Sequence, residues 1–205
     1  TPRSNVSCGR ASLSVARRRN LPRRRQLTER ELLADCLRRL NGLGLPYMLT
    51  GSMASNFWGI PRTTHDLDFV LSFEEDRITA IVSAFESDYD LEAASVRGAF
   101  RKHHMFNAID RRSALKVDFW VLRRVPFEEN MFARRLRVTL FGEPAWIATA
   151  EDTLLHKLYW NRITPSERQL GDAAGIVAVQ GAELDRTYLE HWAGELGVVT
   201  VLGDL

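Results

Sequence analysis

Two short apolar runs, each next to residues suited to binding phosphate or metal, constrain this chain more than any other feature. Residues 46–50 form the first run, which ends at Gly51-Ser52; residues 67–71 form the second, which contains Asp68 and follows Asp66. Short apolar runs bounded by turn residues indicate buried strands. Because side chains two apart on a strand point to the same face, we expect the carboxylates of Asp66 and Asp68 to lie together.

A third acid, Asp118, lies in the middle of another apolar run, residues 115–122. Neighbouring carboxylates repel each other unless a cation lies between them, and a carboxylate without a partner is costly to bury. Magnesium prefers oxygen ligands, and a pair of such ions can clamp the attacking and leaving oxygens of a nucleotidyl transfer. If the two strands are adjacent, Asp66, Asp68 and Asp118 are predicted to be catalytic and to hold two Mg²⁺ ions. The simpler alternatives are a solvated strand end and, for Asp118, an ion pair with an arginine.

The Gly51-Ser52 pair has the character of a phosphate-binding turn. Glycine lets the backbone turn sharply and approach a ligand closely, and a short helix over residues 53–58 would direct its N-terminal N–H groups at an anion. The hydroxyl of Ser52 is a further donor, and Arg62 and Thr64 are placed to add phosphate contacts. A plain turn is the alternative reading.

The remaining elements follow from hydrophobic periodicity and turn residues. A capping-box pattern at Thr28 and Glu31 predicts that folded structure begins near residue 27, with a helix that ends at Gly42–Gly44. Strands are expected over residues 46–50, 67–71, 99–108, 115–122, 137–140 and 145–148, and further helices over residues 53–58, 73–85, 151–160, 166–180 and 186–195. The fold class is therefore α/β (α+β), a small mixed sheet flanked by helices. We expect a catalytic core over residues 27–148 and a packed helical region over residues 149–205.

Charge is distributed unevenly along the chain. Residues 1–26 contain eight arginines and no acid, which leaves 20 basic and 26 acidic residues, a formal charge of −6, for the rest. This Arg-rich leader has three readings: a disordered segment, an arm that attracts nucleic acid, and a transit peptide. No stretch approaches the roughly 18 apolar residues that span a membrane. Cys8 and Cys36 do not suit a disulfide, so we expect a cytoplasmic protein with Cys36 in its core.

The segment from Tyr47 to Leu71 resembles the signature of the nucleotidyltransferase superfamily, whose members have a polymerase-beta-like fold. It has an apolar strand, Gly-Ser, 13 intervening residues and Asp-x-Asp, and Asp118 follows as a later lone acid. The resemblance implies magnesium held by the three acids and transfer of a nucleoside monophosphate from a nucleoside triphosphate such as ATP. It also implies that Gly51 and Ser52 bind the nucleotide and that Asp118 helps to activate an attacking hydroxyl.

The C-terminal half is similar to bacterial AbiEii-like toxins, over a resemblance that covers roughly residues 27–200. It implies that Lys157 faces the nucleotide and that Arg168 and Asp172 belong to a nucleotide-binding helix, although side chains four apart can also form a plain ion pair. The acceptor is open between tRNA, a protein hydroxyl and a small alcohol, and a cognate antitoxin is an implied partner. The alternatives are a nucleotide-binding or regulatory module without turnover, and a hydrolase or kinase that uses the same acids.

Other residues have simpler interpretations. His103 and His104 are read as a solvated edge, and His156 is expected to face away from the site. The five tryptophans are expected in the core: Trp58, Trp120, Trp146, Trp160 and Trp192.

Overall fold

The computed structural model describes residues 27–205, so the predicted Arg-rich leader lies outside the described part. The described chain forms one seven-stranded mixed sheet in the order β3-β4-β5-β2-β1-β7-β6. Its strands are β1 Tyr47–Thr50, β2 Leu67–Leu71, β3 Tyr89–Asp90, β4 Met105–Asp110, β5 Lys116–Val121, β6 Leu136–Leu140 and β7 Glu143–Ile147. Its α-helices are α1 Glu29–Leu43, α2 Gly51–Trp58, α3 Ile78–Phe85, α4 Ala93–Lys102, α5 Pro126–Arg134, α6 Ala150–Ile163, α7 Glu167–Gln180, α8 Arg186–Leu196 and α9 Val199–Gly203.

The first helix begins where the sequence predicts. Thr28 accepts a hydrogen bond from the backbone N–H of Glu31, and the Glu31 carboxylate accepts one from the backbone of Thr28, so the capping box is formed. The helix ends at Gly44, which is left-handed. Cys36 is fully buried on its inner face, as expected.

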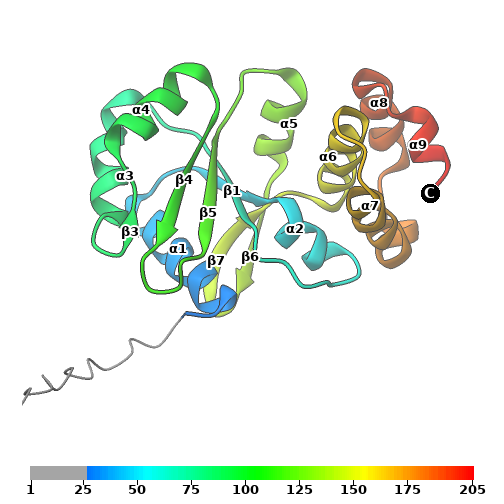
Figure 1. The fold of residues 1–205 in the computed structure, drawn as a ribbon. Coiled ribbons are helices and arrows are strands. Elements are labelled where there is room, and N and C mark those ends of the chain that lie inside the picture. Colours follow the sequence, from blue (N-terminus) through cyan, green and yellow to red (C-terminus); the bar gives the residue numbers. More distant parts are fainter. Residues whose placement is uncertain (1–26) are drawn as a thin grey trace, which may run out of the picture.

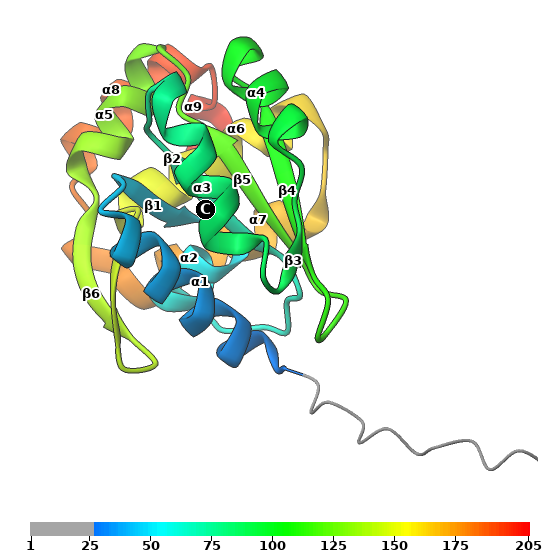
Figure 2. The ribbon, with the colours of Figure 1, turned by 90° about the vertical axis from the view of Figure 1, so that its left-hand side faces the viewer.

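The two faces of the sheet pack against different layers (Figures 1 and 2). One face, which carries Leu49, Phe69 and Phe119, packs with α1, α3 and α4 in the larger hydrophobic cluster. The other face, which carries Met48 and Val70, meets α5 and the C-terminal helices in a second cluster. Strict alternation along each strand separates the two layers. Helices α5 to α9 therefore lie on the side of the sheet opposite α1, with α8 packed on α6 and α9 on α8 (Figure 1).

Two parts of the sequence interpretation are corrected by the structure. Residues 99–108 are not one strand, because α4 continues to Lys102, His103 caps it in the left-handed region with φ 46°, and β4 begins at Met105. Val96 and Ala99 give α4 a buried helical face. Helices α5 and α9 were also not expected; Pro126 at the first turn suits the start of α5.

Among the described residues, no helix combines the length and apolar character needed to cross a membrane.

Candidate active site

Two of the three aspartates, Asp68 and Asp118, lie on adjacent central strands of the sheet, and Asp66 is exposed immediately before β2. Strand β2 pairs in parallel with β5, and the register places Asp68 beside Asp118. On its other side β2 pairs with β1, where Thr50 is opposite Asp68. Directly paired residues point to the same face, and so do residues two apart on a strand. Asp66, Asp68 and Asp118 therefore share the face that meets the C-terminal helices.

The electrostatics of this face favour a cation. Burial raises the pKa of Asp68 to about 6, and the charges of Asp118 and Asp66 add to the rise, against the hydrogen bond from Trp120. One oxygen of Asp118, Oδ1, is buried without a hydrogen-bond partner, and so is the hydroxyl of Thr50. Unpaired buried oxygens next to other carboxylates are the donor set that a hard divalent cation satisfies.

The carboxylates of the three acids are farther apart than the ligands of a bound metal ion would be. Within residues 27–205, no group of three or more His, Cys, Asp and Glu side chains has the arrangement of a metal site. The other oxygen of Asp118, Oδ2, lies 2.8 Å from the Nζ of Lys116, whose side chain is half exposed. The donor chemistry thus fits magnesium, provided that Asp118 exchanges this lysine for the ion.

Position 51, at the turn between β1 and α2, accommodates glycine and no residue with a side chain. Its φ of +63° is left-handed, and a Cβ there would lie 2.3 Å from Oδ2 of Asp68. The chain therefore needs glycine both for the backbone angle and for the close approach to the acid. The N-terminus of α2, which starts at this residue, lies directly beside the aspartates.

Four predicted nucleotide-binding side chains form one polar network. Arg62 donates to both oxygens of Asp172, at 2.6 and 2.8 Å, and to the hydroxyl of Ser52 at 2.9 Å. Lys157 donates to the same carboxylate at 2.8 Å, and Ser55 adds a longer hydrogen bond. Burial opposes the charged form of Asp172, but the hydrogen bonds from Arg62 and Lys157 outweigh it and lower its pKa.

The plain ion pair between Arg168 and Asp172 does not form, because the carboxylate is paired with Arg62 and Lys157 instead. Arg168 lines the cavity described below, whereas Asp172 does not. Thr64 does not line it either; its hydroxyl accepts a hydrogen bond from the backbone N–H of Asp66.

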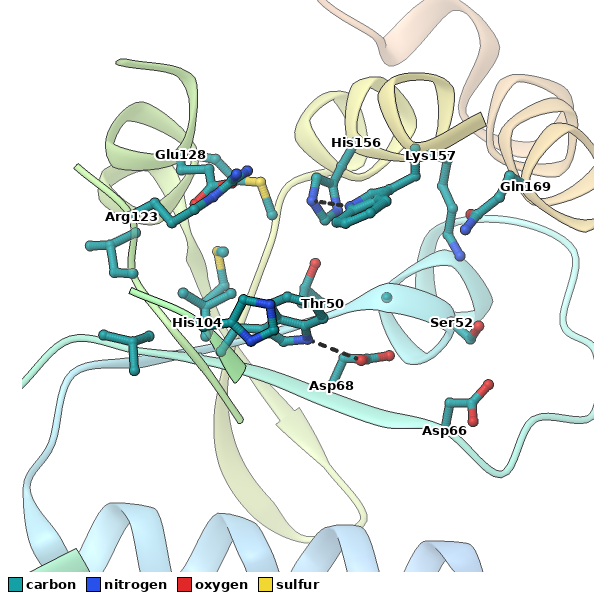
Figure 3. A pocket seen from close by; sticks show the side chains of 18 of the residues that line it. Thr50, Ser52, Asp66, Asp68, His104, Arg123, Glu128, His156, Lys157 and Gln169 are labelled. Carbon is teal, nitrogen blue, oxygen red and sulfur yellow. Dashed lines mark hydrogen bonds and ion pairs between the residues drawn. The ribbon is translucent and has the colours of Figure 1, made fainter. Parts of the chain in front are cut away.

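A cavity of about 460 Å³ lies over Asp66 and Asp68, between the sheet and helices α5, α6 and α7 (Figure 3). Asp118, which pairs with Asp68 in the sheet, does not line it. Predicted residues line one end: Gly51, Ser52, Arg62, Asp66, Asp68, Lys157 and Arg168. The other end is lined mainly by residues that the sequence interpretation did not assign to the site: Met48, Val70, His103, His104, Trp120, Leu122, Arg123, Glu128, Met131, His156 and Trp160. Gln169 also lines the cavity, and its Oε1 is buried without a partner.

The positions of His156, Trp120 and Trp160 correct the sequence interpretation. All three line the cavity, so His156 does not face away and the two tryptophans are not simply core residues. The signal was present in the spacing. Trp120 is two residues after Asp118 on one strand, and Trp160 is three residues after Lys157 on one helix, so each shares a face with a predicted site residue.

No protein-family profile matches this sequence, and no curated protein sequence is similar to it. Solved structures share its fold. The antibiotic-resistance factor ANT(2'')-Ia in solution has a TM-score of 0.56 at 12% identity, with 84% of this chain and 95% of that chain covered. The crystal structure of ANT(2'')-Ia with adenylyl-2''-tobramycin has a TM-score of 0.55 at 15% identity, covering 83% and 98%. A nucleotidyltransferase-like protein from Paracoccidioides brasiliensis has a TM-score of 0.51 at 16% identity, covering 85% and 91%.

At these identities the likeness is one of fold. The chain has the mixed α/β architecture of nucleotidyltransferases, with most of its length in the common fold. The predicted fold class is thereby confirmed.

Proposed function

We propose that this protein is a magnesium-dependent nucleotidyltransferase that moves a nucleoside monophosphate from a nucleoside triphosphate to a hydroxyl group. The observation that carries the proposal is the pairing of Asp68 with Asp118 on one sheet face, with Asp66 on the same face and an unpaired buried oxygen on Asp118. The fold shared with solved nucleotidyltransferases supports the same reading.

The phosphate-binding end is formed by groups of opposite charge to the aspartates. Ser52 and the N–H groups at the start of α2 can cradle the terminal phosphates. Lys157 and Arg62 are held at this end by Asp172, and Arg168 lines it as well. Arg62, Lys157 and Arg168 offer three positive charges to a triphosphate, and magnesium held by the aspartates would offset the carboxylates at the same end, so triphosphate binding is electrostatically favourable.

Asp66, Asp68 and Asp118 would hold the magnesium ions. When bound, the metal neutralises the triphosphate and the charge that develops during transfer. The acceptor oxygen forms a bond to the α-phosphorus, the bond from that phosphorus to the bridging oxygen breaks, and pyrophosphate leaves. Asp118 takes the hydroxyl proton. The chain's contribution is mainly positioning and charge stabilisation.

A role as an AbiEii-like toxin, with a tRNA acceptor, an antitoxin partner and a cytoplasmic location, is compatible with the proposed reaction. Only the resemblance of the C-terminal half to that family supports these finer statements. The predicted division at residue 148 into core and helical region likewise remains a prediction.

A labelling experiment tests the proposed reaction. The protein with Mg²⁺ is incubated with each triphosphate labelled at the α- or γ-phosphate, together with total cellular RNA or protein. Transfer of the α-label with release of pyrophosphate supports the proposal. Transfer of the γ-label would indicate a kinase, and release of free phosphate alone a hydrolase. Magnesium-dependent stabilisation by nucleotide without any turnover would favour the binding module.

The matched variants are Asp118→Asn and Asp76→Asn. Asp118→Asn should abolish transfer while the protein stays folded, because it removes a charge next to Asp68. Asp76 is an exposed aspartate in the turn before α3, so Asp76→Asn should transfer at the wild-type rate. Retained transfer by Asp118→Asn would refute the assigned role of this acid.

A further inference from the structure

If the protein has the function proposed above, the direction of transfer determines which end of the cavity holds the pyrophosphate and which end receives the acceptor. In a nucleotidyl transfer the attacking and leaving oxygens lie roughly in line on opposite sides of the phosphorus. The end near Ser52, Arg62 and Lys157 suits the departing pyrophosphate. The attacking hydroxyl therefore enters from the opposite end, past Trp120.

That opposite end is built around a row of four rings. Ring centroids are 5.9 Å apart between His104 and Trp120, 6.1 Å between Trp120 and Trp160, and 6.0 Å between Trp160 and His156. The rings come from three separate segments: the connection between α4 and β4, strand β5 and helix α6. Figure 3 shows His104 on the sheet side of the cavity with Asp68, and His156 across from them on α6.

Both indoles of this aromatic row already use their N–H groups. Trp160 donates to Nε2 of His156 at 2.8 Å, and Trp120 donates to Oδ1 of Asp68 at 3.4 Å. The tryptophans are therefore oriented by hydrogen bonds, and what remains for a ligand is their ring surface. The neighbouring lining residues Met48, Val70 and Met131 are apolar as well.

The charges at this end do not suit a positively charged acceptor. Glu128 is its one carboxylate among the described lining residues, and it is paired with Arg123, with 2.8 Å between Nε and Oε1. Asp66 and Asp68 belong to the predicted metal site. An ammonium group brought here would find no free carboxylate, and a desolvated charge without a partner is strongly unfavourable.

We propose that the acceptor is a hydroxyl compound with a flat ring and no positive charge, and that its ring packs on Trp120 and Trp160. The site would therefore reject polyamine sugars such as tobramycin, although the fold is shared with ANT(2'')-Ia.

Two alcohols that differ only in the ring test the proposal. The protein is first saturated with Mg²⁺ and a non-hydrolysable ATP analogue, and then titrated with 2-phenylethanol or with its saturated counterpart 2-cyclohexylethanol. Binding is followed by NMR through the indole N–H signals of the tryptophans. We expect 2-phenylethanol to bind about fivefold more tightly, since stacking on an aromatic ring adds about this factor. It should shift the signals of Trp120 and Trp160 and leave that of Trp146 unchanged.

Variants separate the acceptor from the nucleotide. Trp160→Leu should remove the preference for 2-phenylethanol while the ATP analogue still binds as in the wild type, because the Trp160 indole donates to His156 and not to an aspartate. Trp146→Leu, which lies outside the cavity lining, should preserve the preference. If Trp160→Leu does not fold, Trp120→Leu tests the preference between the two alcohols from β5; nucleotide binding is not compared in that variant, because Trp120 donates to Asp68. Equal affinity for the two alcohols would overturn the proposal, as would tighter binding of tobramycin.

Weaker binding of the ATP analogue to Trp160→Leu would also overturn the proposal, because the aromatic row would then hold the nucleobase. Failure of the analogue to bind the wild-type protein would instead refute the proposed function itself. That result appears at the first titration, before an alcohol is added.

Discussion

Asp172 organises the phosphate-binding end without lining the cavity, and its removal has a calculable effect. Its side chain is 4% exposed and accepts hydrogen bonds from Arg62 and Lys157, whose side chains are 29% and 7% exposed. Asp172→Asn keeps the shape but leaves both cations without a counter-ion. Breaking a buried ion pair by neutralising one partner costs about 3–5 kcal/mol. For a chain of this size that corresponds to a melting temperature lower by about 10 °C.

The assay is denaturant unfolding of wild type and Asp172→Asn as a function of pH. The folded-state pKa of Asp172 is depressed, so its contribution is present above the ordinary pKa of an aspartate, near 4, and is lost as pH falls through the folded-state value. The difference between the two proteins should therefore be full at pH 7 and vanish in acid. Asp90→Asn, which removes the exposed pair with Arg111, should change stability by less than about 1 kcal/mol. A difference for Asp172→Asn that is equally small, or that does not depend on pH, would refute the reasoning.

Three further changes test other parts of the site. Gly51→Ala should cost about 1–2 kcal/mol of stability from the left-handed backbone and displace Asp68, so a nucleotide thermal shift should disappear. Lys116→Met removes the ammonium group that pairs with Asp118 and would compete with Mg²⁺ for its carboxylate. Calorimetry should therefore show Mg²⁺ binding about 3- to 10-fold tighter, and weaker binding would contradict this competition. Burial lowers the pKa of His156 to about 4, below its ordinary value near 6.5, so this residue makes the folded state less stable as pH falls from 6.5 towards 4. His156→Gln should flatten that part of the pH profile of unfolding, and an unchanged profile would count against it.

The local parts of the fold were predictable because local patterns determine them. The capping box at Thr28, the strand that ends at Thr50 and the strand over residues 67–71 all lie where the sequence indicates. The shared face of Asp66 and Asp68 follows from the alternation of side chains on a strand. Whether Asp118 lies close to Asp68 depends on which strands are neighbours, and sequence spacing does not determine that. The parallel pairing of β2 with β5 places the two residues side by side.

Tertiary contacts decided what local spacing could not. The helical spacing of Arg168 and Asp172 allows an ion pair, but Arg62, which is 110 residues from Asp172, takes its place. His156 and Trp160 lie one helical turn apart on α6, which the sequence spacing already indicates. That both line the cavity with Lys157 depends on the packing of α6 over the sheet. The strand expected at residues 99–108 is confirmed only from Met105 onward. Residues up to Lys102 belong to α4, because its buried face packs against α3, a contact that the local sequence does not indicate.

A crystal structure with Mn²⁺ and a non-hydrolysable nucleoside triphosphate analogue tests the central claim most directly, because manganese can be located by its anomalous scattering. We expect anomalous density in contact with the carboxylates of Asp66, Asp68 and Asp118, with the triphosphate against Ser52 and the start of α2. Nucleotide bound elsewhere in the protein, or manganese bound away from Asp68 and Asp118, would contradict the account.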